Sequence, residues 1–147
     1  MTVAVNAELR EFVIRRANHI CEYCLISESD AYLKFQIEHI ISRKHGGGSE
    51  PENLALACVF CNLHKGSDIA SISPETGELV RFYDPRNDRW NKHFRLNGAE
   101  IVPISDIGEA TVRILKINSE DRLLERQLLI NLGRYPGEEA VLVITEH

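Results

Sequence analysis

The sequence predicts a single α+β domain, and three observations lead to this prediction. The chain has 147 residues, the usual length of one domain. Short stretches of alternating apolar residues, typical of β-strands, are interspersed with stretches of helical spacing. Four cysteines form two Cys-x2-Cys pairs with none left over. We therefore expect one domain over residues 1–147, built from helices and short strands around a cysteine cluster.

Composition and charge exclude several classes of protein. A hydrophobic content of 44% and a charged content of 27% are typical of a soluble globular chain. No apolar run approaches the roughly 20 residues that a membrane span needs, so no membrane partner is expected. The stretch 1–12 lacks a basic region followed by an apolar segment, so we expect no signal peptide and a cytoplasmic location. The net charge of −5 is concentrated over residues 96–147, which makes that half an unfavourable nucleic-acid surface.

The N-terminal half is expected to contain a helix, a hairpin and a second helix. Asn6 can cap a helix over residues 7–18, whose apolar stripe comprises Leu9, Phe12, Val13, Ala17 and Ile20. Residues 32–41 alternate and predict a strand, and residues 53–58 predict a second strand antiparallel to it. The glycine-rich stretch 42–53 between them is expected to be a loop. A short helix over 61–68 is expected to stop near Gly66.

The C-terminal half is expected to add a small sheet and two helices. A turn at 73–78 precedes a predicted strand at 78–84. Asn97-Gly98, between alternating flanks, predicts a hairpin over 93–105. A helix begins at Ser105 or Asp106, and Ser119 can cap another that ends at Gly133. Residues 138–147 are expected to form a short strand or an irregular tail.

The two cysteine pairs, Cys21/Cys24 and Cys58/Cys61, predict a structural metal site. Two Cys-x2-Cys pairs some thirty residues apart match a tetrahedral four-cysteine zinc site. A reduced cytosolic chain would not use these cysteines as structural disulfides. A redox-active pair and chance clustering are the alternatives, and the presence of a second pair argues against both.

The residues between and after the cysteine pairs form an ordered motif. Its members are Glu38-His39, the glycines Gly46 to Gly48, Asn53-Leu54, and Asn62 and Lys65 after the second pair. This order resembles the HNH endonuclease family in its zinc-stapled form, closely over about residues 20–68 and more loosely over 74–94. The resemblance implies a ββα-metal fold, in which a hairpin and a helix hold one magnesium-like ion against the scissile phosphate. The expected fold is then a zinc-stapled ββα-metal (HNH) core with an N-terminal helix, a small additional β-sheet and C-terminal helices, with residues 69–147 as an extension.

The resemblance also implies a role for each motif residue. His39 matches the general base that activates the attacking water. Glu38, where the family usually has Asp, and Asn62 match the ligands of the catalytic Mg²⁺ or Mn²⁺. Asn53 matches the residue that ties the loop and orients the hairpin. The chemistry of the residues agrees: a neutral histidine can accept a proton near pH 7, and carboxylate and amide oxygens suit Mg²⁺.

Backbone geometry constrains these assignments. In a regular strand Glu38 and His39 point to opposite faces, so both reach one site only if the strand ends or bulges there. On the following helix Lys65 shares the face of Asn62, whereas His64 turns away from it. We therefore expect Lys65 to contact a DNA phosphate and His64 to be a surface residue.

Basic residues indicate where nucleic acid would bind. Arg43 and Lys44 lie in the glycine-rich loop, and Arg81, Arg86, Arg89, Lys92 and Arg95 lie near Trp90 and His93. An ordinary solvated surface explains the same charges equally well. Because the chain is acidic overall, we expect DNA binding to be weak and salt-dependent. A homodimer through the C-terminal leucines is left open.

The leading hypothesis is a metal-dependent endonuclease that hydrolyses phosphodiester bonds of DNA. The alternative is a catalytically silent zinc module that binds nucleic acid or a protein partner. A thiol oxidoreductase is a third and weaker hypothesis. The sequence does not distinguish DNA from RNA as the substrate.

Overall fold

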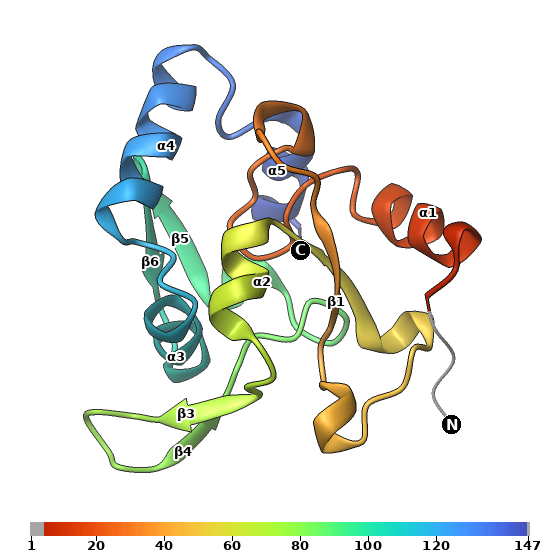
Figure 1. Cartoon of the computed structure of the whole chain (residues 1–147). Coiled ribbons are helices and arrows are strands. Elements are labelled where there is room, and N and C mark those ends of the chain that lie inside the picture. Colours follow the sequence, from red (N-terminus) through yellow and green to blue (C-terminus); the bar gives the residue numbers. More distant parts are fainter. Residues whose placement is uncertain (1–4, 147) are drawn as a thin grey trace.

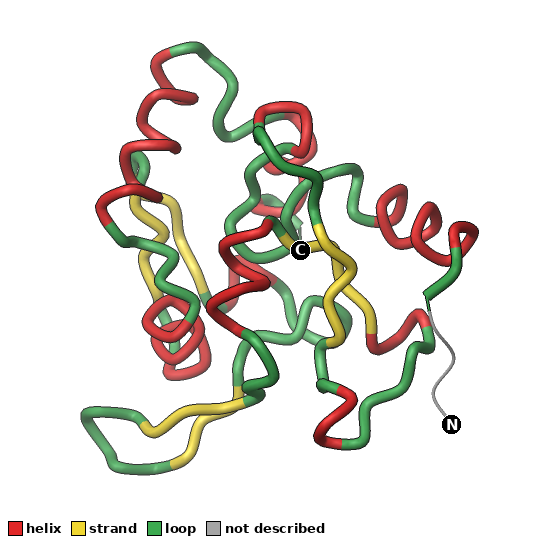
Figure 2. Tube along the Cα trace, viewed as in Figure 1, coloured by secondary structure: helices red, strands yellow, loops and turns green. Residues whose placement is uncertain are grey.

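The computed structural model describes residues 5–146, so the first four residues of the N-terminal stretch discussed above, and His147, lie outside it. Five α-helices occur in the described chain: α1 Ala7–Arg16, α2 Val59–Lys65, α3 Asp106–Ile114, α4 Glu120–Asn131 and α5 Glu138–Ile144. The strands form three antiparallel two-stranded sheets (Figures 1 and 2). The mixture of helices and small sheets confirms the α+β prediction. Among the described residues no helix has the length and apolar character needed to cross a membrane.

The first sheet and α2 form the ββα unit that the sequence predicted. Strand β1, Gln36–His39, pairs antiparallel with β2, Leu54–Ala57, so that Glu38 lies opposite Ala55. All four residues of β2 are buried. Helix α2 follows β2 after Cys58, begins two residues earlier than predicted, and stops at Lys65 with Gly66 as its C-cap, as expected. Strand β1 is shorter than the predicted strand over 32–41, since residues 32–35 lie outside the ladder.

Helix α1 supports this unit from one side. The Asn6 side chain accepts a hydrogen bond from the Leu9 backbone N–H at 2.8 Å, which is the predicted cap. Val13 is fully buried, while Phe12 of the same stripe remains 44% exposed. Arg16, at the last turn, donates to the carbonyl oxygens of Pro51 and Leu54 at 2.9 and 2.6 Å. The helix is thereby fixed to the start of β2.

Two further hairpins follow α2. Strands β3, Ala70–Ile72, and β4, Leu79–Arg81, form a hairpin that projects from the body of the molecule (Figure 1). The three residues of β3 are too few to show an alternating pattern, so the sequence predicted only a strand near β4. Strands β5, Phe94–Asn97, and β6, Glu100–Pro103, meet at the predicted turn, where Gly98 has a φ of 60°.

The prediction of a strand or an irregular tail over 138–147 was wrong: the described residues 138–146 of this stretch contain the helix α5. Its β-branched residues favour a strand locally. However, Ala140 is buried, and Val143 and Ile144 pack against the same core at helical spacing. Burial of this stripe outweighs the weak strand propensity.

One continuous core connects the ββα unit with the C-terminal extension. Trp90 is 1% exposed and lies 5.1 Å from Phe94 between ring centroids. Its indole Nε1 donates to the backbone oxygen of Tyr23, between the first two cysteines, at 2.9 Å. Trp90 is therefore a core residue and does not belong to the basic surface with which the sequence associated it.

Candidate metal centre and active site

Each Cys-x2-Cys pair lies in a tight turn that points both of its thiols the same way. The backbone N–H of Cys24 donates to Cys21 Sγ at 3.5 Å, and that of Cys61 donates to Cys58 Sγ at 3.4 Å. In the first turn Leu25 has a φ of 65° and donates its N–H to the Cys21 carbonyl. In the second turn Cys58 caps the N-terminus of α2. Local backbone geometry thus orients both thiols of each pair in the same direction.

The four thiols converge on one point. All four cysteines are buried and reduced, and their Sγ atoms lie within 4.8 Å of one another. The Sγ atoms of Cys24 and Cys58 are 3.8 Å apart. Zinc–sulfur bonds of about 2.3 Å in a tetrahedron require sulfur–sulfur distances of about 3.8 Å. The donor set and its size therefore fit a zinc ion.

Glu38 is buried in a polar cluster beside this centre. Its carboxylate is 2% exposed and accepts a hydrogen bond from the Tyr23 hydroxyl at 2.5 Å. It also forms an ion pair with the Lys65 ammonium, which is 1% exposed and donates to the Ile40 carbonyl at 3.0 Å. Burial raises the pKa of Glu38, although Lys65 and Tyr23 act in the opposite direction.

His39 points away from that cluster, because β1 is regular up to its last residue. The ring is partly exposed, and its Nε2 lies 3.0 Å from the Ser49 hydroxyl of the glycine-rich loop. Partial burial lowers the pKa of His39, and the positive charges of Arg43 and Lys65 lower it further. Both effects favour the neutral imidazole, the form that accepts a proton.

An open hollow of about 330 Å³ lies between the end of β1, the glycine-rich loop and α2. Its lining includes Glu38, His39 and Asn62, with Arg43 and Lys44 from the loop. Asn62 belongs to α2 and directly follows Cys61, so the residue after the last cysteine borders the hollow. The hollow thus has all three predicted residues in its lining, even though the side chains of Glu38 and His39 point to opposite faces of β1.

Asn53 ties the loop to the end of β1. Its side chain accepts from the Ile41 N–H at 2.9 Å and donates to the carbonyl oxygens of Ile41 and Gly48 at 2.9 and 2.8 Å. The loop also needs glycine at position 47, where a Cβ would lie 1.7 Å from the Ile41 oxygen. Asn53 is therefore a supporting residue next to His39.

The basic residues named from the sequence divide into two groups. Arg43 and Lys44 are exposed at the rim of the hollow. Lys65 is instead buried against Glu38 and is not among the residues that line the hollow. Of the more distant residues, Arg86 pairs with Glu22 and Arg81 pairs with Asp88 at 2.7 Å.

Sequence reasoning missed two residues that touch the metal centre. Arg122 of α4 donates to the Sγ atoms of Cys58 and Cys24 at 3.2 and 3.0 Å. The Tyr135 hydroxyl donates to the Cys24 carbonyl at 2.8 Å. Both residues lie in the C-terminal extension, and no local pattern marks either of them.

Comparison with known proteins agrees with this geometry. Residues 21–68 match the family model of the HNH endonuclease. The matched segment begins at the first cysteine and includes all four cysteines together with Glu38, His39, Asn53 and Asn62. Neither a curated protein nor a solved structure matches the chain. The segment 21–68 thus matches the HNH endonuclease model and carries a four-cysteine cluster compatible with zinc.

Proposed function

We propose that the protein is a divalent-metal-dependent endonuclease that hydrolyses phosphodiester bonds of DNA in the cytoplasm. The observation that supports this function is the hollow in the HNH segment, whose lining includes His39, Asn62 and Glu38. A general base and hard oxygen ligands are the two requirements of metal-assisted phosphodiester hydrolysis. The thiols of the cysteine cluster are soft donors and serve a different metal, zinc.

In this proposal His39 removes the proton from the attacking water. The Ser49 hydroxyl lies 3.0 Å from Nε2 and orients the ring. In the tautomer whose Nε2–H donates to Ser49 Oγ, Nδ1 keeps the lone pair that accepts the proton of the water. Asn53 acts on His39 indirectly, because it fixes the loop that carries Ser49. The lowered pKa of His39 keeps the base in its neutral form at physiological pH.

Glu38 and Asn62 would hold the catalytic Mg²⁺ or Mn²⁺. Carboxylate and amide oxygens match the preference of these ions, and both residues line the hollow. When bound, such an ion supplies charge stabilisation to the phosphate and to the leaving oxygen. In the structure the carboxylate has Lys65 as its cationic partner, so metal binding would exchange one cation for another.

Arg43 and Lys44 are proposed to position the DNA backbone, since they are exposed beside the hollow. With a net charge of −5 the chain offers little further attraction, so binding should be weak and should weaken further as salt is added. Lys44→Ala should lower DNA affinity and reduce its salt dependence, with the fold unchanged.

A plasmid-nicking assay tests the function. Zinc-loaded protein should nick supercoiled DNA with Mg²⁺ or Mn²⁺ and should stop when excess EDTA removes the exchangeable ion. A parallel assay on a single-stranded RNA and a DNA of the same sequence decides the substrate. The absence of cleavage with every divalent ion would contradict the proposal.

A catalytically silent zinc module is the second candidate, and the engagement of Glu38 favours it. The carboxylate is 2% exposed and already has Tyr23 and Lys65 as partners. If this ion pair is permanent, no divalent ion reaches Glu38. DNA binding that is independent of Mg²⁺, together with no cleavage, would identify this candidate.

A further inference from the structure

We propose that Arg122 is a positioning residue of the metal centre, through which the C-terminal helix α4 secures zinc in the HNH segment. The inference concerns metal retention and does not depend on the proposed nuclease activity. Arg122 lies outside the segment 21–68 that matches the family model, so this contribution comes from the extension.

The contact of Arg122 joins the two halves of the cysteine cluster. One guanidinium nitrogen donates to Cys58 Sγ at 3.2 Å and the other to Cys24 Sγ at 3.0 Å. The two sulfur atoms come from different Cys-x2-Cys pairs. Because the guanidinium is planar and rigid, its fork fixes the separation of these sulfur atoms, 3.8 Å, at the value that zinc requires.

Charge gives the contact its energetic importance. Four thiolates and one Zn²⁺ carry a net charge of about −2, and all four sulfur ligands are buried. A buried charge is costly unless it is paired and hydrogen-bonded. Arg122, itself 4% exposed, brings one positive charge into direct contact with this anionic centre. Both partners thereby avoid an uncompensated buried charge.

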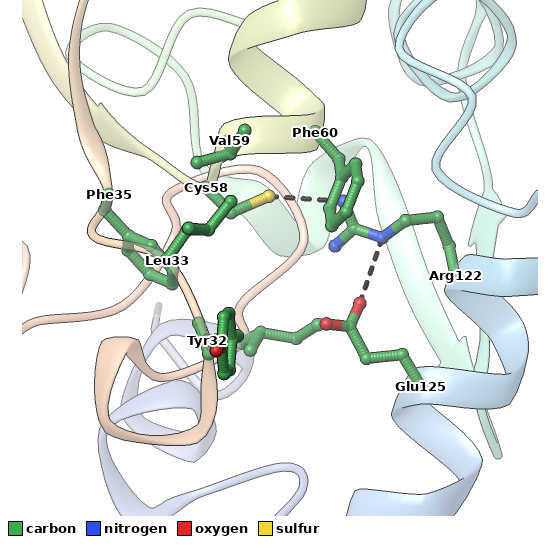
Figure 3. Close-up of a pocket in the computed structure, with 10 residues that line it drawn as sticks. Tyr32, Leu33, Phe35, Cys58, Val59, Phe60, Arg122 and Glu125 are labelled. Atoms are coloured by element: carbon green, nitrogen blue, oxygen red, sulfur yellow. Dashed lines mark hydrogen bonds and ion pairs between the residues drawn. The ribbon is translucent and has the colours of Figure 1, made fainter.

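The guanidinium is held in this orientation by its neighbours. Its Nε lies 3.2 Å from the Glu125 carboxylate, one turn further along α4, and its Cζ lies 5.1 Å from the Phe60 ring centroid. Figure 3 shows Arg122 between Phe60, Glu125 and the sulfur of Cys58. Side chains of α2 and α4 therefore hold the guanidinium in place, and the contact is not that of a freely moving, exposed arginine.

Helix α4 is anchored independently at its next turn. Arg126 is fully buried and donates to the Ala99 carbonyl at 2.6 Å and to the Asn118 side chain at 2.9 Å. The helix thus connects the metal centre with the β5–β6 turn. Docking of α4 should strengthen zinc binding, and zinc binding should strengthen docking of α4 by the same factor.

Zinc affinity tests the proposal directly. Competition with a chromophoric chelator should show that Arg122→Met loses about 10- to 100-fold in zinc affinity, as removal of such outer partners does. Arg122→Lys should lose less, because it retains the charge but not the fork. Arg15→Met, which removes an exposed arginine, is the control and should match the wild type.

Cobalt substitution separates this role from a merely structural one. Loss of two N–H donors raises the electron density on sulfur, so the sulfur-to-cobalt charge-transfer band of Arg122→Met should move to lower energy. A variant that only loosens α4 would bind less cobalt without moving the band. Wild-type affinity in both Arg122 variants, or reduced affinity with an unmoved band, would overturn the proposal. If Arg122→Met does not fold, the proposal is tested instead by the band position and the metal affinity of Arg122→Lys.

Discussion

The four-cysteine cluster and the hollow at His39 are adjacent but are built in opposite ways. The cluster has four identical soft donors, all of them buried. The hollow has mixed hard donors and is open to solvent on one side. The two sites meet at consecutive residues of α2, since Cys61 belongs to the cluster and Asn62 borders the hollow. The closed cluster suits a structural role, whereas the open hollow suits the exchange of substrate and metal that the proposed function requires.

Two side chains connect the sites. Tyr23, from the turn between the first cysteines, donates to Glu38, and Lys65, at the end of the helix that begins at the second pair, forms the ion pair with it. Glu38 is thus held by elements that the cysteine cluster joins. Changes to the cluster should therefore reach the hollow, whereas changes to His39 should not reach the cluster.

The largest expected effect comes from removal of the metal. Cys61→Ser, or stripping zinc with a strong chelator, should abolish cooperative thermal unfolding, because structural zinc contributes on the order of 10 kcal/mol or more to small domains. Thermal melts followed by circular dichroism measure this effect. Added zinc should restore the stripped wild type but not the variant. A native melt in the stripped protein would show that the cluster is not needed for the fold.

A smaller effect is expected from the ion pair that links the sites. Lys65→Met leaves Glu38 as an unpaired buried carboxylate and should lower the free energy of unfolding by about 3–5 kcal/mol. Denaturant titration measures the loss. The double variant with Glu38→Gln should recover part of it, since no buried charge then remains. The matched control is Lys44→Met, at an exposed position, which should be close to neutral.

The smallest effect is expected from the tyrosine hydroxyl. Tyr23→Phe removes one hydrogen bond to a charged group, so the free energy of unfolding should fall by about 1.5–3 kcal/mol. Tyr32→Phe provides the control, because Tyr32 is fully exposed. Zinc content should be the same in both variants. Equal stability of the two variants would mean that Tyr23 does not support Glu38.

The parts of the molecule that are local in sequence were predicted well. The fixed spacing of Cys21/Cys24 and Cys58/Cys61 indicated the cluster, and alternation along β1 indicated that Glu38 and His39 diverge. Contacts between distant segments left no trace in the sequence. Arg122 contacts Cys24 from 98 positions away in the sequence. Helical spacing likewise did not reveal that the Lys65 side chain is buried.

Helix α5 shows why the remaining error arose. Its residues favour a strand when considered alone, and only the core beneath Ala140 determines that they form a helix. The same limit applies to Trp90, whose neighbours in sequence are basic but whose neighbours in space are aromatic. Tertiary packing decided both cases.

The central claim is that His39 is the base of a metal-dependent nuclease, and a comparison of two histidine variants tests it most directly. The rate of plasmid nicking with Mg²⁺ or Mn²⁺ is measured for His39→Ala and for His64→Ala, a neighbour on α2 that does not line the hollow. Both variants should retain zinc and the wild-type melting temperature. His39→Ala should lose about 10²- to 10⁴-fold in rate, while His64→Ala should cut like the wild type. Equal cleavage by His39→Ala and the wild type would contradict the account.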